Sequence, residues 1–300
     1  IRFAPAVMSL FGLALAWRNL AETVDWVDPI ASILSIGAVL FGLVTLGSIV
    51  VHMTSRAAFL ETIQHPQLKI LPACLTVGLM LLSALLAPHL PTLARVLIWV
   101  AALGHLGLLA WLLNGWFAGS IPLEQVTPVW FIPTVGNIVI PIGAIAAGEP
   151  MLAWVGFSIG LILWLALLPI VLFRLIHAAP LPPENEASKL VLVAPPAIGS
   201  VAWVTLTGGD QLILGVMLLS VASFLALTLL PMMTRVMLGS FSPANWSFGF
   251  PLAALASGLV LYAEALDLIG LAYAGLFVLV SVSLIVVWLL IASARILVKN

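Results

Sequence analysis

The amino-acid sequence predicts an all-α integral membrane protein built from five copies of a helical hairpin. Its composition favours a bilayer, because 63% of its 300 residues are hydrophobic and only 7% are charged, whereas a soluble domain carries about 25% charged residues. Apolar runs of about 18 residues or more, long enough to cross hydrocarbon, recur along the chain. A proline that opens an apolar segment also returns about every 60 residues, and such a period is typical of repeat architectures.

Five repeats of this period make one transmembrane domain, 1–300. The expected repeats are approximately 1–60, 61–120, 121–180, 181–240 and 241–300. They contain ten expected spans, in chain order 3–20, 30–53, 68–88, 91–114, 127–147, 150–176, 188–207, 211–238, 244–264 and 268–297. Each repeat begins with a shorter span that carries a proline in its first half or middle, and continues with a longer span in which prolines are rare.

The two kinds of span are expected to occupy different places. Proline removes a backbone donor and frees a carbonyl, which lipid cannot satisfy. The odd spans therefore belong inside the protein, kinked at their marking prolines, which are Pro5, Pro72, Pro133, Pro196 and Pro251. The interiors of the even spans carry only Pro169 and Pro231, so these spans suit a lipid-facing surface. We expect an inner ring of kinked odd helices that forms a pore, within an outer ring of even helices.

Polar and small residues recur at one offset from these prolines. Four residues after each proline stand Ser9, Thr76, Asn137, Ser200 and Leu255, one helical turn further along the same face. This pattern has two interpretations of equal weight, because small and hydroxyl residues favour close helix packing in membranes but also line paths that repeats share. The candidate pore-lining residues are Ser9, Thr76, Asn137, Ser200, Gly136, Gly199 and Ala254.

The residue immediately before each marking proline suggests a gate. These residues are Ala4, Leu71, Ile132, Pro195 and Phe250. If they converge on an axis, Phe250 alone places an aromatic ring across it, and a hydrophobic constriction of this kind can exclude water and ions. The alternative is that Phe250, one of 13 phenylalanines, packs between helices.

Charge patterning predicts the orientation and favours anions. Ten spans put both termini on one side of the membrane, and only Arg18 and Arg95 of the ten basic residues then fall on the other side. The positive-inside rule therefore makes both termini cytoplasmic. No acidic residue lies within an odd span except Glu264 at an end, whereas cation pathways normally carry acidic rings. Candidate basic residues at the cytoplasmic mouth are Arg174, Lys189 and Arg235, which would either concentrate anions or simply anchor the helices.

Other chemistries find little support in the sequence. His105 is the only ionisable group well inside a span, and we interpret it as a structural hydrogen-bonding residue rather than a proton carrier. The other histidines lack metal-ligand spacing, so we expect no metal and no cofactor. No catalytic motif of a soluble enzyme is present, and no basic tract suggests nucleic acid. We therefore expect a protein that is not an enzyme.

Four stretches, in matching order, resemble the tellurite-resistance/dicarboxylate transporter family, which is the family of TehA and the plant slow anion channels. They are Ala16-Trp-Arg18, Thr127-Pro-Val-Trp-Phe-Ile-Pro-Thr-Val-Gly-Asn-Ile-Val-Ile-Pro141, Pro195-Pro-Ala-Ile-Gly-Ser-Val-Ala-Trp203 and Trp246-Ser-Phe-Gly-Phe-Pro-Leu-Ala253. The resemblance implies a bacterial member in the inner membrane, with a pore of quasi-fivefold symmetry in each subunit of a homotrimer. It also implies that the phenylalanine before the ninth-helix proline, Phe250 here, plugs the pore.

Three functions remain open on the sequence alone. A gated channel for small inorganic or organic anions is favoured by the uncharged, proline-marked spans. A secondary transporter or exporter of C4-dicarboxylate, sulfite or tellurite-related anions is the main alternative. A membrane scaffold that transports nothing is the third. In each case the lipid bilayer is the medium, and no nucleic acid is involved.

Overall fold

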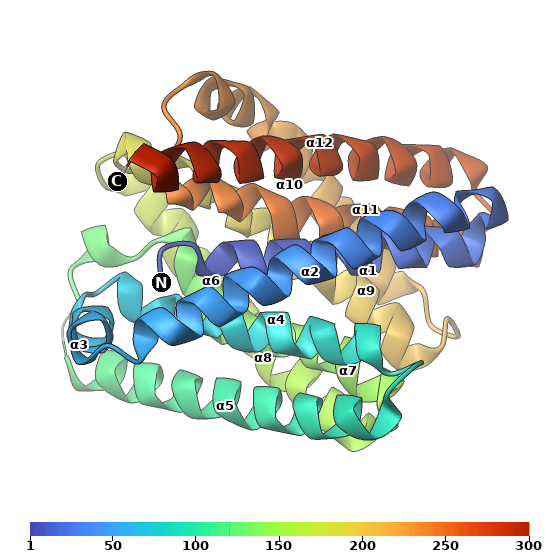
Figure 1. Cartoon of the computed structure of the whole chain (residues 1–300), viewed down its shortest axis with the longest axis horizontal. Helices are drawn as coiled ribbons and strands as arrows, with labels where there is room; N and C mark the ends of the chain where they lie inside the picture. The colour runs from blue at the N-terminus through green and yellow to red at the C-terminus, as the bar shows by residue number, and fades with distance from the viewer. Residues whose placement is uncertain (120, 300) are drawn as a thin grey trace.

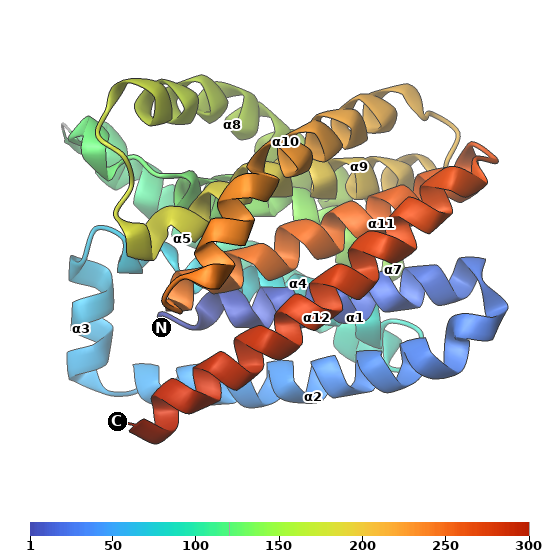
Figure 2. The ribbon, with the colours of Figure 1, turned by 90° about the horizontal axis from the view of Figure 1, so that it is seen from above.

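A computed structural model describes residues 1–119 and 121–299, and within them the chain is helical throughout (Figure 1). Both termini lie at the same end of an elongated helical bundle (Figures 1 and 2). In the described part of the chain, nine helical stretches are long and apolar enough to cross a membrane. The predicted first span is a tenth long helix, α1 (Ala4–Thr23), which falls outside these nine and whose last turns contain Arg18 and Glu22.

The even predicted spans are long α-helices. They are α2 (Asp28–Met53), α5 (Pro91–Ala118), α8 (Pro150–His177), α10 (Ile213–Leu238) and α12 (Ile269–Lys299). Asn300, which ends the fifth predicted repeat, lies outside the described residues. Three further short helices connect the long ones: η1 (Asp25–Val27), α3 (Arg56–Gln64) and η3 (Leu123–Gln125).

The odd predicted spans after α1 combine 3₁₀ and α segments. They are η2 (Leu68–Ile70) with α4 (Pro72–Leu86), η4 (Pro128–Trp130) with α6 (Phe131–Val135), η5 (Gly136–Val139) and α7 (Ile140–Ala146), η6 (Pro183–Val193) with α9 (Ala194–Thr207), and η7 (Pro243–Phe248) with α11 (Gly249–Ala265). All five marking prolines lie in the first turn of an α-helix, where a missing N–H breaks no helical hydrogen bond. The backbone discontinuity in the last four of these spans is therefore a junction of 3₁₀ and α geometry.

Burial separates the two kinds of span, as the proline pattern predicts. In the odd spans from Leu68–Leu86 onward, 67–94% of the apolar window is buried. In the five even helices only 22–33% is buried. Most of α1 is also buried, including its hydroxyl residue Ser9. The prediction that the proline-marked spans are inside and the long spans outside is confirmed for burial.

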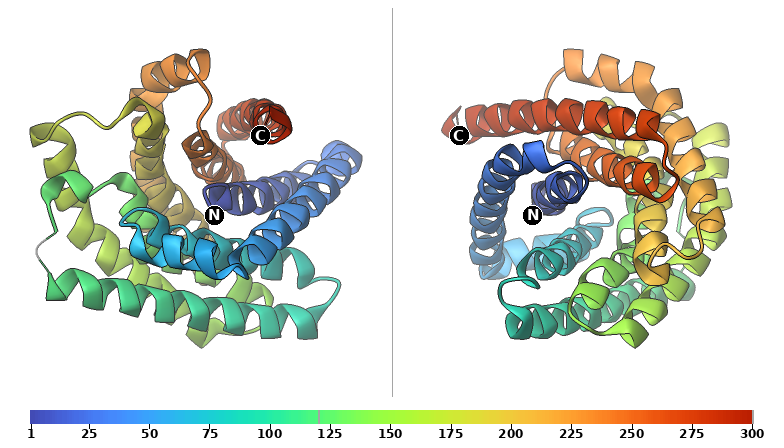
Figure 3. Two further views of the ribbon diagram at one scale, coloured as in Figure 1. Left: turned by 60° about the vertical axis from the view of Figure 1, so that its left-hand side comes forward. Right: turned by 90° about the vertical axis from the view of Figure 1, so that its right-hand side faces the viewer.

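The buried segments contact one another in a closed order. Helix α1 packs against α4, α4 against α7, α7 against α9, α9 against α11, and α11 returns to α1. Each buried segment also packs against the long helix that follows it in the chain. Figure 3, which looks more nearly along the bundle, shows the long helices outside these segments.

Glycines let the long helices approach the buried ones. A Cβ atom on Gly42 of α2 would lie 2.5 Å from Cε1 of Phe11 on α1. A Cβ on Gly156 of α8 would lie 2.6 Å from Cβ of Ile140, and one on Gly275 of α12 would lie 2.8 Å from a methyl carbon of Val260 on α11. Small residues that permit such close backbone approach are the usual means of packing membrane helices.

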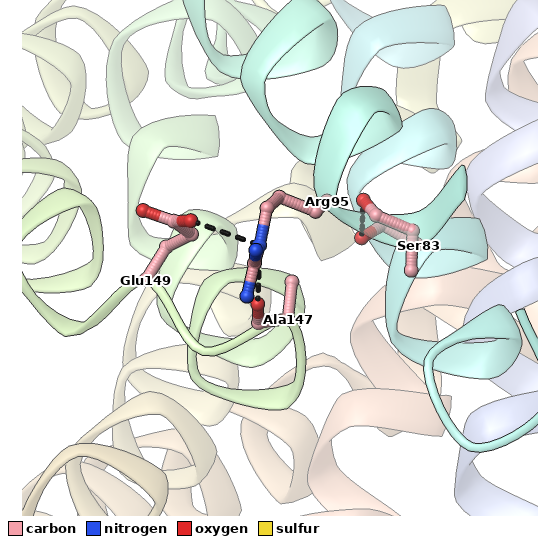
Figure 4. Close-up of polar contacts among 5 residues, drawn as sticks. Ser83, Arg95, Ala147 and Glu149 are labelled. Atoms are coloured by element: carbon pink, nitrogen blue, oxygen red, sulfur yellow. Dashed lines mark hydrogen bonds and ion pairs between the residues drawn. The ribbon is translucent and has the colours of Figure 1, made fainter. Parts of the chain in front are cut away.

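Two arginines tie neighbouring hairpins together at the end away from the termini. Arg18 on α1 donates to the carbonyl of Leu85 on α4 at 2.9 Å. Arg95 at the start of α5 donates to the carbonyl of Ala147 at 3.3 Å and pairs with Glu149 at 3.1 Å (Figure 4). These are the two basic residues that the sequence places on the far side of the membrane.

Candidate functional site

A small apolar cavity lies where the five buried segments meet. Its volume is about 30 Å³, room for little more than one water molecule. Every buried segment contributes to its wall. The lining residues are Met8, Val77, Phe131, Ile132, Val135, Gly136, Val139, Val191, Ala194, Pro195, Ile198, Phe250 and Pro251. No charged side chain is among them, so an ion at this point would lose its hydration without gaining a charged partner.

Phe250 lies in the wall of this cavity, as the second residue of α11. Its side chain is only 5% exposed. The ring rests against α1 at Gly12, where an added Cβ would lie 3.0 Å from Cδ2 of Phe250. Gly12 therefore provides the space that the ring occupies. A methyl group added at position 12 would press directly on the ring.

Phe131 is a second aromatic residue of the cavity wall that the sequence reasoning missed. The comparison of repeats considered only the residue immediately before each marking proline, which in this repeat is Ile132. Phe131 stands two residues before Pro133. Because the segment around it alternates between 3₁₀ and α geometry, residues one and two positions before the proline both reach the cavity. A search over both positions in each repeat would have found it.

A larger and more polar cavity of about 530 Å³ opens at the end that carries the termini. We call it the vestibule. All five buried segments or their leading turns line it: Arg2, Pro5, His65, Gln67, Leu68, Leu71, Val129, Ile132, Glu184, Asn185, Ser188, Phe241, Ser242, Pro243, Ala244 and Ser247. Ile132 lines both cavities, so it marks the boundary between them.

The four polar residues predicted to line the axis form hydrogen bonds with backbone carbonyls or with another side chain. The hydroxyl of Ser9 reaches the carbonyls of Pro5 and Trp246, at 2.8 and 3.0 Å. Ser200 donates to the carbonyl of Ala197 at 2.7 Å. A hydroxyl in apolar surroundings commonly satisfies itself on the preceding helical turn, and these two match the packing interpretation.

The other predicted lining residues are also spread over different surroundings. The amide nitrogen of Asn137 donates to the carbonyl of Thr134, and its Oδ1 has no partner among the described residues. Gly199 faces Leu218 on the outer helix α10, and Ala254 is buried in α11. Of the seven predicted lining residues, only Gly136 borders the apolar cavity.

Thr76 and His105 form a buried pair behind that glycine. The Thr76 hydroxyl lies 2.9 Å from the carbonyl oxygen of Ala73 and 2.7 Å from Nδ1 of His105. Nε2 of His105 has no partner within hydrogen-bond geometry among the described residues. A Cβ on Gly136 would lie 2.8 Å from this atom. His105 thus fills the space behind Gly136 and does not line the cavity.

The three predicted mouth cations are not among the residues that line the vestibule. Arg174 is buried on α8, 3% exposed, and its Nε has no partner in the described part of the chain. Lys189 pairs with Glu186 at 2.6 Å. Arg235 borders a hollow at the end of α10, together with Glu184 and Glu186, and this hollow shares Glu184, Phe241 and Ser242 with the vestibule. The basic residue that does line the vestibule is Arg2.

The fold and these cavities define an α-helical membrane protein whose buried segments surround a narrow apolar constriction. The chain belongs to the SLAC1 family of voltage-dependent anion channels, whose family model matches residues 1–296. This is a family of anion channels and transporters and not of enzymes. The protein is accordingly a multi-pass membrane protein, and anion transport is the activity of its family.

The chain is similar to individual members of this family at low sequence identity. The chain is 28% identical to the S-type anion channel SLAH1 of Arabidopsis thaliana over 189 residues, 62% of this chain and 49% of the relative. It is 23% identical to the tellurite resistance protein TehA homolog of Haemophilus influenzae over 257 residues, 83% of this chain and 77% of the relative. The match to the plant channel thus spans about half the length of that relative. The predicted family resemblance is confirmed.

Proposed function

We propose that this protein is a gated anion channel of the bacterial inner membrane and that the Phe250 ring closes its pore. The observation that carries the proposal is the convergence of five buried segments on an apolar cavity that contains this ring. A polar vestibule leads to it from the end that carries the termini. A ring held in an uncharged constriction stops ions because it leaves them no room and no hydration.

The proposal includes a definite architecture. Ten transmembrane helices form five hairpins in quasi-fivefold symmetry, with both termini in the cytoplasm and one pore in each subunit of a homotrimer. The closed order of contacts from α1 through α4, α7, α9 and α11 supports the ring. Native mass spectrometry of the purified protein should give the mass of a trimer, and a monomer in several mild detergents would reject this part of the proposal.

The pathway is proposed to favour anions. The central cavity carries no acidic side chain, whereas a cation path is normally marked by acidic rings. Arg2 in the vestibule adds positive charge, although Glu184 in the same wall offsets it. Selectivity then depends on the wall of the path and not on the ring that closes it.

A voltage-clamp measurement on the protein in planar bilayers tests the channel proposal. The parent is expected to pass little anion current, and Phe250→Ala is expected to pass a large one that follows the anion gradient alone. Phe248→Ala is the matched control, since Phe248 is fully buried two residues earlier but does not line the cavity. Current that rises equally in both variants would mean general damage and not an opened gate.

A coupled secondary transporter or exporter of C4-dicarboxylate, sulfite or tellurite-related anions is the second candidate. One relative is named a tellurite resistance protein homolog, and another, in Methanocaldococcus jannaschii, an uncharacterized transporter. Coupling usually requires an ionisable group at depth, and His105 is the one described inside a span. Flux into liposomes that depends on an imposed proton gradient, and that His105→Gln uncouples, would favour this candidate over the channel.

A further inference from the structure

A crevice on the outside of the bundle combines an apolar trough with a charged end. It is lined by residues of α1, α2 and α4, and its volume is about 530 Å³; Figure 1 shows these three helices side by side. Its apolar walls come from α2 and α4, including Ile36, Val39, Leu40, Leu82 and Leu86. Ile36 and Leu40 are 61% and 58% exposed. Since these long walls face the hydrocarbon in a membrane-spanning protein, the crevice is open to lipid along its length.

Charges of both signs border one end of this crevice. Arg18 lies on α1, with Glu22 one turn further on, and Asp28 begins α2. One N–H of Arg18 donates to the carbonyl of Leu85, and a guanidinium has five such donors. Among the described ion pairs, Arg18 makes none with Glu22 or Asp28. His89 also lines the crevice. The end of the crevice therefore presents an arginine and two carboxylates that do not pair with one another directly, with an imidazole beside them.

The dimensions of the crevice match one leaflet of a bilayer. Its lining on α2 runs from Asp28 to Leu40, which at 1.5 Å per residue is about 18 Å of helix. Half of a typical hydrocarbon core is about 15 Å thick. The charged end lies at the ends of α1 and α4 that are away from the chain termini. A lipid seated here would hold its headgroup among the charges and its chain along the leucines.

The geometry points to a binding site for one phospholipid with an amine headgroup, of the phosphatidylethanolamine type. Arg18 faces the phosphate as a donor that can hold two oxygens. Glu22 and Asp28 accept hydrogen bonds from the primary ammonium. A choline headgroup has the same charges but no N–H to donate, and a glycerol headgroup has no cation. The site is therefore expected to rank ethanolamine lipids above choline and glycerol lipids with the same acyl chains.

A lipid fits this crevice better than a second copy of the chain. The apolar groove between α5 and α8, lined by residues such as Leu109 and Ile162, has a similar volume but no charged side chain. Charges at one end only, at headgroup depth, are what distinguishes the crevice at α2 from that groove. A second copy in the proposed trimer would meet this face through a heterologous contact, with a different surface of its own, and that occupant is an outcome of the test below.

The test is lipid binding to the purified full chain, measured by native mass spectrometry with phosphatidylethanolamine, phosphatidylcholine and phosphatidylglycerol of identical acyl chains. The parent is expected to bind the ethanolamine lipid about fivefold more tightly than the choline lipid, a difference in the range of one partly exposed ion pair. The double variant Glu22→Gln, Asp28→Asn should bind the two lipids equally. Arg18→Gln should weaken binding of all three lipids.

Two further variants keep the test decisive if Arg18→Gln folds poorly. Ser32→Trp fills the crevice from its exposed side without changing a charge, and it should reduce retention of every lipid. Arg95→Gln is the matched control, because Arg95 lies on the same side of the membrane but outside the crevice. It should leave binding unchanged.

Equal binding of ethanolamine and choline lipids by the parent would overturn the proposal. So would lipid retention that Ser32→Trp does not alter. The variant Ile36→Cys, in a Cys74→Ser background, tests whether a second copy of the chain covers the crevice. If it forms a disulfide with another subunit in membranes, a second copy covers the crevice and no lipid site exists there. None of these results depends on whether Phe250 gates a pore.

Discussion

The buried segments and the outer helices of this protein have similar composition but opposite constraints. The apolar windows of the last four buried segments are 67–94% buried, and those of the outer helices 22–33%. The buried segments contain 3₁₀ stretches and satisfied hydroxyls, whereas the outer helices are continuous and long. Irregular backbone at membrane depth persists only where protein or water satisfies it. Hydrophobicity therefore suits both kinds of segment to the membrane. Backbone irregularity marks the last four buried segments, whereas α1 is buried as one continuous helix.

The largest expected effect on anion conductance comes from removing the phenyl ring of Phe250 from the buried segments. Phe250→Ala is expected to raise anion conductance by at least about tenfold, which corresponds to a barrier lower by about 1.4 kcal/mol. Selectivity for anions over cations should persist, because the cavity wall and not the ring provides it. Single-channel recording in gradients of chloride and of potassium measures both. A folded variant that conducts no more than the parent would remove Phe250 as the gate.

The stability of the same variant separates a gate from a packing residue. Truncating a well-packed phenylalanine costs about 3–5 kcal/mol, and Phe248→Ala, at a fully buried site, is expected to show a loss of this size. Phe250→Ala should lose much less, since part of its ring borders a cavity. Thermal unfolding in detergent compares the two. Equal losses would favour the interpretation that Phe250 only packs between helices.

The packing of an outer helix on a buried helix can be disrupted at a single glycine. Gly42→Ala places a methyl group against the ring of Phe11, and such overpacking typically costs about 1–3 kcal/mol. Gly37 lies on the same helix, and a Cβ there would meet nothing within 4 Å. Gly37→Ala should therefore be neutral or stabilising by up to about 1 kcal/mol, the helix propensity difference. Midpoints of thermal unfolding that fall equally would show that Gly42 has no special contact.

A smaller effect is expected where α1 supports the gate. Gly12→Ala adds a methyl group 3.0 Å from Cδ2 of Phe250, so the ring must shift by a few tenths of an ångström. We expect a leak current in this variant, above the parent and below Phe250→Ala. In the double variant Gly12→Ala, Phe250→Ala, the change at Gly12 should add no further current, because there is no phenyl ring left to displace. Additive currents in the double variant would place the two residues in separate effects.

The smallest expected effect concerns charge at the vestibule. Arg2→Gln, measured in the Phe250→Ala background, should reduce conductance at low salt, because Arg2 lines the vestibule. Arg235→Gln should reduce it less, because Arg235 does not line the vestibule itself and lies beside Glu184 and Glu186. Both reductions should be less than about twofold at 0.15 M salt and should vanish at 1 M, where the screening length is about 3 Å. A reduction that persists at 1 M would mean that the arginine contacts the ion directly.

The sequence was sufficient for the large-scale order of the protein and for part of the site. Proline spacing predicted which spans are buried, and the repeat alignment selected Phe250, which does lie at the cavity. The same alignment did not predict which groups the hydroxyls of Ser9 and Ser200 contact. A hydroxyl within a helix can bond its own preceding turn at almost any angle around the axis, so its presence alone does not say which way the face points.

Hydropathy also could not predict the local backbone geometry of the buried segments. The 3₁₀ stretches η6 and η7 advance the chain by about 2.0 Å and 120° per residue, against 1.5 Å and 100° in an α-helix. An offset counted in α-helical turns therefore points in the wrong direction after a few such residues. Phe131 stands between two further 3₁₀ segments, η4 and η5. Lys189, within η6, lies three residues after Glu186, one turn of a 3₁₀-helix, and pairs with it.

The glycines at which the outer helices meet the buried ones also bear on how this family can diverge. An outer residue such as Leu227 or Phe277, more than two-thirds exposed, has to be apolar but has no partner whose shape it must match. Selection at such positions acts on hydropathy alone, and one large apolar residue serves as well as another. At Gly42, Gly156 and Gly275 it acts on volume, and even one methyl group is excluded. Exchanges among large apolar residues should therefore be tolerated on the lipid-facing surface, whereas these three glycines should tolerate no larger residue.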